Sequence, residues 1–285
     1  MTECYGYRVS AIDPEAVRRE AERVTTTLSA SLGESVTVLI DTHYPYHPSS
    51  GMVTNPAVVA GVIDHLRLSD RSVSIVPITP SWSDTRGCLE YLGYDSVLDT
   101  RNVTIGQQRA ESTVSRTVHI GERDVIITIP ESLLTDVLCV PTLRPGSPPS
   151  QPCGSWLLAQ AALEREPTED ECIAFGACIE ATGLLDATYS MVETPRRTKA
   201  LFASDDVAAI DHLAATFQRG PQPAVVSALQ PKPPRQIGLD PREIADPVSE
   251  SAAPTTDSGL MAKTYRAYAR VSGDLLPPQL LHRHE

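Results

Sequence analysis

The sequence predicts an α/β protein in which helices flank a mostly parallel sheet, with an antiparallel hairpin as an insertion. Three observations lead to this fold class. Short apolar runs occupy 36–41, 72–79 and 136–141, and such runs are typical of buried strands. Segments with apolar residues at helical spacing separate the first two runs, and this βαβα order favours parallel strands. The alternating segments 113–120 and 124–130 bracket a Gly-Glu-Arg turn, which predicts the hairpin.

The first half of the chain contains three helices with clear start and end signals. An Asp, Asn or Ser that can cap the helix precedes each apolar pattern, a proline follows two of these caps, and glycines end the first and third patterns. The predicted helices are 13–33 (Asp13, Pro14, Gly33), 55–66 (Asn55, Pro56) and 83–93 (Ser83, Gly93).

The second half is predicted from the same kinds of signal. Thr168 and Glu171 have the spacing of a capping box, and the Pro- and Gly-rich stretch 142–154 indicates a loop. After the hairpin, the predicted elements are the strand 136–141, a helix over 155–165, a helix from Thr168 through Ile179 closed by Gly183, strands at 184–192 and 199–203, and a helix capped by Ser204 or Asp205 that ends at Gly220.

The composition changes towards the C-terminus. Prolines become frequent after Pro221, and the stretch 248–260 has too little apolar content to order itself. Tyrosines and leucines return in 261–285. We therefore expect one α/β domain over 1–247, a disordered linker over 248–260 and a C-terminal tail over 261–285 that could dock on the domain or on another protein.

The charge balance excludes several classes of partner. The 285 residues carry 36 acidic and 24 basic side chains, which gives a net charge of −12, and only three of the basic residues are lysines. Nucleic-acid binding and a polybasic membrane anchor both need clustered positive charge, so neither is expected. The excess of carboxylates fits a salt-adapted source such as a halophilic archaeon, with arginine-biased codon usage as the alternative for the scarcity of lysine.

The cysteines and the N-terminus point to an intracellular setting. No two of the six cysteines form a C-x-x-C pair, so we expect buried, reduced thiols and no iron–sulfur cluster. The start of the chain lacks a basic segment followed by an apolar one, and no window reaches the ~18 apolar residues of a membrane helix. A cytoplasmic location follows; the cofactor, if one exists, is unknown.

Four stretches, in this order, resemble the family called domain of unknown function 362. They are VLIDTHYPYHPSSGMVTNPAVVAGVIDHL (38–66), YLGYDSVL (91–98), LLTDVLCVPTLRPG (133–146), and DATYSMVETPRRTKALFASDDVAAIDHLAA (186–215) with QIGLDPREIAD (236–246) after it. The resemblance covers about 5–247. It implies an α/β domain with a cleft at the C-termini of its strands, and relatives often carry a ferredoxin-type iron–sulfur module.

This chain departs from the family pattern at its basic loops. The family's K-P-N position reads Asp41, Thr42 and His43 here, and its K-L-K-T-H position reads 142–146, Thr-Leu-Arg-Pro-Gly. Most of the basic groups that would face an anionic ligand are therefore absent. The iron–sulfur cysteines are absent too.

The end of the strand 36–41 carries the candidate catalytic pair. Asp41 and His43 are two residues apart, so their side chains can leave the same face of the strand, at the edge where open α/β sheets bind ligands. The pair could transfer a proton. A metal site would need further ligands, such as Asp84 or Asp186. The alternative is a polar loop whose histidines contact water.

The candidate ligand-binding residues lie after other strands. Ser81 could donate to an anion near the helix start at Ser83, which N-capping alone also explains. Three arginines could grip a carboxylate or phosphate, or could instead pair with acidic surface groups: Arg144, Arg196 and Arg197.

Two acids of the last predicted helix complete the candidate set. Asp206 lies near its start, where the helix dipole favours a carboxylate without any catalytic reason. Asp211 lies one turn further and could form the floor of a cleft.

The sequence leaves two functions open. The first is a small-molecule or metal-binding enzyme domain in which arginine holds an anionic substrate and Asp41 with His43 moves a proton. The second is a degenerate, non-catalytic accessory protein whose tail docks a partner, such as a redox or maturation complex. No G-x-S-x-G, Walker-type or G-x-G-x-x-G motif occurs, which removes the commonest hydrolase and nucleotide-binding alternatives.

Overall fold

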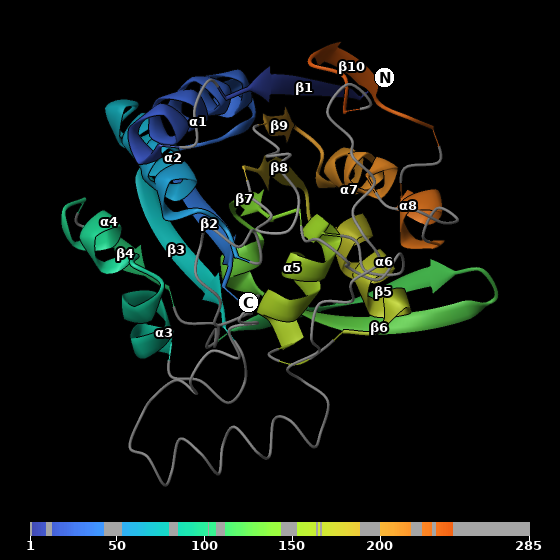
Figure 1. Cartoon of the computed structure of the whole chain (residues 1–285). Helices are drawn as coiled ribbons and strands as arrows, with labels where there is room; N and C mark the ends of the chain where they lie inside the picture. Colours follow the sequence, from blue (N-terminus) through green and yellow to red (C-terminus); the bar gives the residue numbers. More distant parts are fainter. Residues whose placement is uncertain are drawn as a thin grey trace, which may run out of the picture.

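A computed structural model of the chain gives the architecture (Figure 1). It describes residues 2–9, 13–42, 53–79, 85–101, 103–106, 112–143, 153–163, 165, 167–188, 200–217, 224–229 and 232–241. The predicted linker 248–260 and tail 261–285 lie outside these residues.

A mixed sheet forms the centre of the molecule. Within the described residues it has eight strands, in the order β10 (Arg235–Gly238), β1 (Glu3–Arg8), β9 (Ala200–Ser204), β8 (Ala181–Ala187), β7 (Asp136–Val140), β2 (Ser35–Asp41), β3 (Ser72–Ile78) and β4 (Thr104–Ile105). Neighbouring strands are parallel except that β9 is antiparallel to both β8 and β1. The predicted α/β class with a mostly parallel sheet is confirmed.

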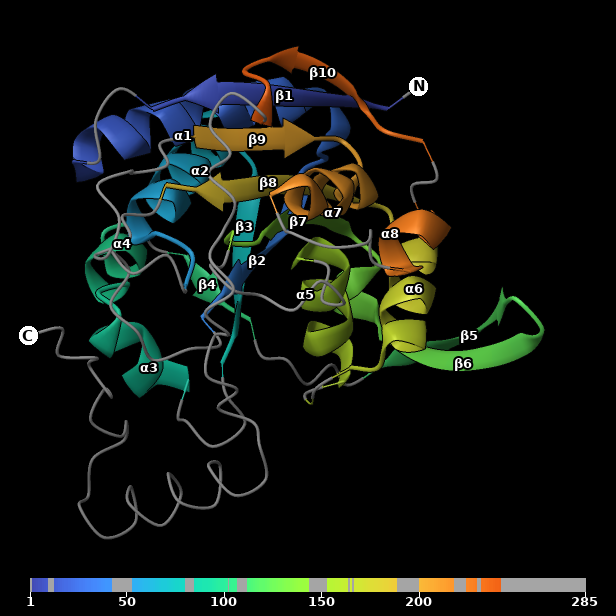
Figure 2. The same ribbon diagram turned by 45° about the vertical axis from the view of Figure 1, so that its right-hand side comes forward.

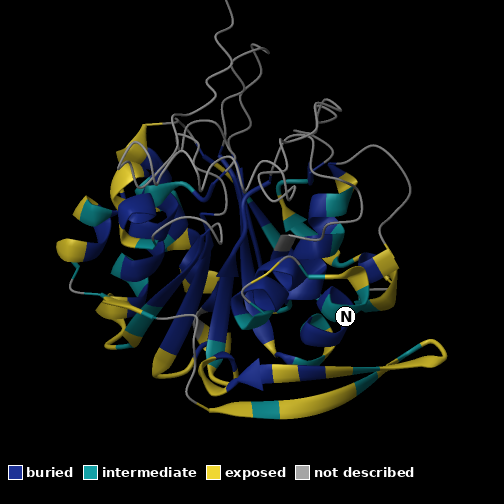
Figure 3. Ribbon diagram, turned by 90° about the horizontal axis from the view of Figure 1, so that it is seen from below, coloured by how far each residue is buried: buried dark blue, intermediate teal, exposed yellow. Residues whose placement is uncertain are grey.

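Helices cover both faces of the sheet. On one face are α1 (Pro14–Leu28), α2 (Pro56–Leu68), α3 (Thr85–Tyr91) and α4 (Asp95–Asp99); on the other are α5 (Cys153–Leu163), α6 (Glu169–Cys178), α7 (Val207–Thr216) and α8 (Ala224–Leu229). The alternation of β2 explains the two layers, because Val38 and Ile40 join the core under α1 and α2 while Leu39 joins the core under α5 and α6. Figure 3 shows the buried strands between the two layers.

The capping signals of α2 and α6 act as predicted. The Asn55 side chain caps α2 by accepting from Ala57 N at 2.9 Å. Thr168 and Glu171 form the capping box of α6, with Glu171 N donating to Thr168 Oγ1 at 3.3 Å and Thr168 N donating to Glu171 Oε2 at 2.8 Å. Each bond satisfies a backbone N–H that the first helical turn leaves free.

The predicted hairpin is confirmed as β5 (Thr113–Ile120) and β6 (Arg123–Pro130), which pair as a separate antiparallel sheet. Its inner face packs on α6 through side chains such as Val118 and Val125. The outer face is polar apart from Ile126, which is 74% exposed. The tip extends past α6 (Figure 2).

The structure corrects two boundaries in the second half. Gly183 does not close a helix: α6 ends at Cys178, and Gly183 lies inside β8, where a Cβ atom would come within 2.6 Å of Ile210 Cγ1. Its role is close packing of the strand on α7. The N-cap of α7 is Asp206, whose side chain accepts from Ala208 N at 2.9 Å, rather than Ser204 or Asp205.

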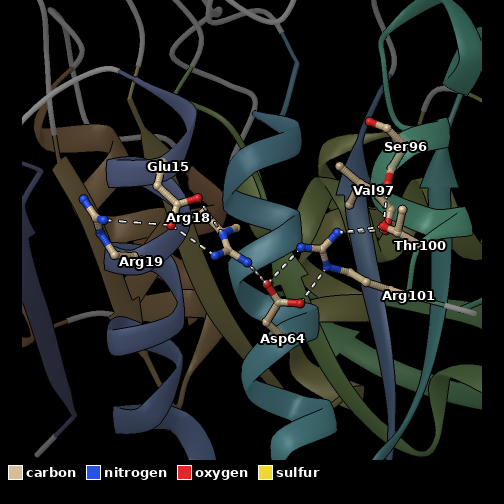
Figure 4. A network of polar contacts seen from close by, with 8 residues as sticks. All are labelled: Glu15, Arg18, Arg19, Asp64, Ser96, Val97, Thr100 and Arg101. Carbon is tan, nitrogen blue, oxygen red and sulfur yellow. Dashed lines mark hydrogen bonds and ion pairs between the residues drawn. The ribbon is translucent and has the colours of Figure 1, made fainter.

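One carboxylate ties three segments of the first helical layer together (Figure 4). Asp64 of α2 accepts from Arg18 of α1 at 2.8 Å and from Arg101, after α4, at 2.7 and 2.9 Å. Partial burial opposes ionisation, but the hydrogen bonds from Arg101 and Arg18 prevail and lower the pKa of Asp64 below its ordinary value. The network therefore contributes stability above that ordinary value, and the contribution is lost as the pH falls through the lowered pKa.

Asp64→Ala is expected to lower the free energy of unfolding by about 1–2 kcal/mol, because the two arginines lose a partly buried partner. Urea denaturation at neutral pH measures the loss. Glu15→Ala is the matched control, because the Glu15 side chain also pairs with Arg18 but is 54% exposed. Its loss should lower the free energy of unfolding by less than about 0.5 kcal/mol. A loss in Asp64→Ala below about 0.5 kcal/mol, the limit expected for the control, would show that the Asp64 network adds no more than an exposed ion pair.

Candidate functional site

The parallel strands bring several predicted positions to one edge of the sheet. Four adjacent strands run in the same direction: β2 pairs with β3 and with β7, and β7 pairs with β8. Their last residues, Asp41, Ile78, Val140 and Ala187, therefore lie at the same edge, which we call the carboxyl edge. Ligands of open α/β sheets bind at such an edge.

Asp41 is held at this edge by Thr54. Asp41 is 2% exposed. Asp41 N donates to Thr54 Oγ1 at 3.0 Å, and Thr54 N donates to Asp41 O at 2.8 Å. The same Thr54 hydroxyl donates to Val140 O at 2.7 Å. One side chain thus joins the ends of β2 and β7.

Asp186, in β8, provides a second buried carboxylate. Its Oδ2 accepts from Asn55 N at 2.8 Å, and its Oδ1 accepts from Thr188 N at 2.9 Å and from Thr188 Oγ1 at 2.5 Å. Burial raises the pKa of Asp186, although the hydrogen bonds from Thr188 and Asn55 act against the rise. The backbone of Asp186 also bonds to the segment after β7, because Leu143 N donates to Asp186 O at 2.8 Å.

Tyr94 contacts the backbone of Thr54. It is fully buried, and its hydroxyl donates to the Thr54 carbonyl. Burial raises the pKa of Tyr94 well above its ordinary value, and the charges of Asp186 and Asp41 raise it further, so both carboxylates act on the phenol.

The backbone conformation of Gly93 directs the chain so that the Tyr94 side chain is buried. Gly93 has a φ of +80° at the C-terminus of α3, where Gly93 N donates to Glu90 O and Tyr94 N to Leu89 O. This pair of bonds is a Schellman motif, which needs a residue with positive φ and favours glycine.

Five candidate residues lie outside the described part of the chain: His43, Ser81, Arg144, Arg196 and Arg197. So does Asp84, a further metal ligand that the sequence suggested. The described residues that precede them most closely are Thr42, Thr79, Leu143 and Thr188, which follow the four parallel strands. The predicted convergence of the arginines and of the Asp41–His43 pair stays a prediction.

Asp206 is not brought together with Asp41. β9 is antiparallel to β8, and Ser204 at its end pairs with Gly183 near the start of β8. Asp206 therefore lies at the opposite edge of the sheet, where it caps α7. Burial raises its pKa, against the hydrogen bond from Ala208 N.

Asp211 is buried between α7 and α5. Its carboxylate accepts from Gly154 N at 2.5 Å, from Ser155 N at 3.0 Å and from the Ser155 hydroxyl. Burial raises the pKa of Asp211 to about 6, although the bonds from Ser155 and Gly154 oppose the rise. In the structure this carboxylate satisfies the first turn of α5; a ligand-binding role stays a prediction.

Metal binding has limited support among the described residues. They contain no group of three or more His, Cys, Asp and Glu side chains placed to hold an ion. The described cysteines lie in different elements apart from Cys172 and Cys178 of α6; Cys4, Cys88, Cys139 and Cys172 are buried as predicted, and Cys178 is half-buried.

Sequence reasoning missed Thr54, Tyr94 and Thr188 as parts of the edge. Thr54 directly precedes the cap of α2, and Tyr94 follows the glycine that stops α3. A polar residue beside a helix boundary is usually explained by capping, and only the tertiary contacts reveal a different role.

Comparisons with protein-family models, with curated proteins and with solved structures give no match for this chain. The resemblance to domain of unknown function 362 accordingly stays a prediction. Among the helices that the structure describes, none is long and apolar enough to cross a lipid bilayer.

Proposed function

We propose that the protein binds a small anionic ligand at the carboxyl edge and that Asp41 and His43 move a proton there. The observation that carries the proposal is the common edge at which β2, β3, β7 and β8 end. The chain continues from these strand ends into the segments that contain His43, Ser81, Arg144 and the Arg196–Arg197 pair.

The positive charge for such a ligand has to come from arginine side chains. Helix N-termini often hold anions, but two of them are already satisfied from within the protein. Ala57 N of α2 donates to Asn55, and the first N–H groups of α5 donate to Asp211. Asp41 and Asp186 are acids and offer an anion no attraction, so the attraction has to come from cationic groups in the neighbouring segments. Arginine suits this role because its planar guanidinium binds carboxylate and phosphate in a bidentate manner.

Asp41 supports the proton-transfer part of the proposal. A buried carboxylate at a strand end can orient an imidazole two residues away and stabilise its charged form. The imidazole would then exchange a proton with a bound substrate. The reaction and the substrate beyond this class stay open.

Thermal unfolding with inorganic phosphate, small carboxylates and divalent cations tests the proposal. A ligand that binds only the folded state stabilises it by about 2.7 kcal/mol at a hundred times its Kd. The shift by an anion should disappear in Arg144→Ala and in Arg196→Ala/Arg197→Ala. Arg19→Ala is the control, since Arg19 lies on α1 with an exposed side chain and a long 3.9 Å ion pair to Glu15. A rise in melting temperature with divalent cations alone would indicate a metal site instead of an anion site. No rise with any of these ligands would reject the site.

A second candidate function is partner docking by the tail 261–285 of a non-catalytic protein. The observation that favours it is that the described sheet is built within residues 3–238, so these strands use nothing from the tail. Deleting 255–285 should leave thermal unfolding unchanged and abolish capture of a partner by the purified protein. A large fall in the melting temperature would instead assign the tail to the fold.

A cytoplasmic, salt-adapted setting completes the proposal. The net charge of −12 is its basis, because salt screens the repulsion between surface carboxylates. Equal stability at low and molar salt would remove the salt-adapted part.

A further inference from the structure

We infer that Thr54 and Asn55, supported by Tyr94, hold the ends of β2, β7 and β8 as one cooperative unit, the strand-end clasp. The clasp lies where α2 begins. Thr54 bonds to Asp41 of β2 and to Val140 of β7, and Asn55 bonds to Asp186 of β8. Two consecutive residues therefore link three strands of the sheet.

Every polar group of Thr54 is used in the clasp. Its N–H donates to Asp41 O, its hydroxyl accepts from Asp41 N and donates to Val140 O, and its carbonyl accepts from Tyr94. Thr54 is fully buried, so a broken bond leaves a donor or acceptor without water to replace it. Partial opening is costly, and the bonds should break together.

Asn55 extends the clasp to β8. Its N–H donates to Asp186 Oδ2 at 2.8 Å and its Nδ2 donates to Thr188 Oγ1 at 3.4 Å, while Asp186 Oδ1 accepts from Thr188 N. The peptide bond that joins Thr54 to Asn55 is rigid. A shift of Thr54 must therefore move the donor that faces Asp186.

Tyr94, in the first helical layer, holds Thr54 in place through its hydrogen bond to the Thr54 carbonyl. The Schellman motif at Gly93 fixes the backbone of Tyr94, and Val97 N and Leu98 N donate to Tyr94 O as α4 begins. The phenol is protonated at neutral pH in any case, and burial raises its pKa further, so it remains a donor to Thr54. Thr54 and Tyr94 act through other groups and are positioning residues.

The consequence for ligand binding rests on the proposed function. The described chain leaves the clasped strands at Thr42, Leu143 and Thr188. Because the clasp fixes these points relative to one another, it would preorganise groups that approach one ligand from different strands.

Amide hydrogen exchange on the full chain tests the clasp without any ligand. Thr54→Val removes only the hydroxyl, yet the amides of Asn55 and Thr188, whose acceptor Asp186 is untouched, should exchange faster by about tenfold or more. Thr54→Ser keeps the hydroxyl and should restore their protection, and Tyr94→Phe should weaken it. The control is Thr25→Val, which removes an equally buried hydroxyl that donates to Ala21 O in α1. Unchanged exchange at Asn55 and Thr188 in Thr54→Val, or the same change in Thr25→Val, would overturn the proposal.

Inorganic phosphate separates this inference from the proposed function. If phosphate stabilises the wild type, Thr54→Val should weaken its binding about tenfold relative to Thr25→Val of matched stability, with recovery in Thr54→Ser. If phosphate binds the wild type and Thr54→Val binds it as tightly as Thr25→Val does, the positioning role of Thr54 is wrong. If phosphate has no effect on the wild type, the anion site fails while the exchange data still decide the clasp.

Discussion

Asp211→Ala is expected to lower the free energy of unfolding at neutral pH by about 3 kcal/mol, because it leaves buried donors without an acceptor. Gly154 N, Ser155 N and the Ser155 hydroxyl all donate to this carboxylate. Removing the buried charge recovers part of its desolvation cost, which keeps the loss below the sum of the three bonds. Urea denaturation measures the change.

Asp211→Asn separates the charge from the shape of the side chain. The pKa of Asp211 rises to about 6 in the folded protein, so between its ordinary pKa and about 6 the folded state binds more protons than the unfolded state. The group's stabilising contribution is therefore fully present below its ordinary pKa, and about 2 kcal/mol is lost as the pH rises from about 4 to 7. Asp211→Asn should remove this slope from the pH profile of stability, and an unchanged slope would place the titration elsewhere.

Gly61→Ala is expected to destabilise the protein by about 2–4 kcal/mol, although alanine is the better helix former by about 1 kcal/mol. Gly61 lies where α2 crosses α1, and an added Cβ would come within 2.1 Å of Arg18 O and 2.8 Å of Ala21 Cβ. The first contact is with backbone, so no rotamer change relieves it, and the two helices must separate. Thermal or urea unfolding measures the loss.

Gly121→Ala is the control for the Gly61 variant. It adds the same methyl group at the hairpin turn, where nothing lies within 4 Å of the new atom. Its φ of +61° alone should cost about 1 kcal/mol. A Gly61→Ala variant as stable as the wild type would mean that α1 and α2 do not pack this closely.

The elements that the sequence predicted well are those with local signals. Asn55 and Pro56 mark the start of α2, and the turn at 121–122 fixes the register of the hairpin. Such caps and turns act within a few residues. The parallel arrangement followed because helices alternate with apolar strands.

The missed elements depend on contacts between distant residues. β1 and β10 pair Glu3 with Arg235, and neither strand has the apolar run of a central strand. Gly183 was misread for a related reason: its small size serves packing against Ile210 rather than a helix end. No local pattern distinguishes these two uses of glycine.

The candidate site was predicted only in part. Asp41 was found because it ends an apolar strand. Thr54 and Tyr94 were not, because their contact joins residues 40 positions apart and is formed only when α2 and the turn after α3 meet. Asp206 was grouped with Asp41 because sequence alone did not reveal that β9 reverses direction.

Chemical-shift mapping of the full chain with inorganic phosphate would show whether the carboxyl edge of the sheet binds an anion. If it does, the largest saturable changes among the described residues are expected at the amides of Thr42, Asn55, Leu143 and Thr188. The starts of the same strands, at Ser35, Ser72 and Asp136, should remain unchanged. Saturable changes centred on those strand starts, or no saturable change anywhere, would contradict anion binding at the carboxyl edge.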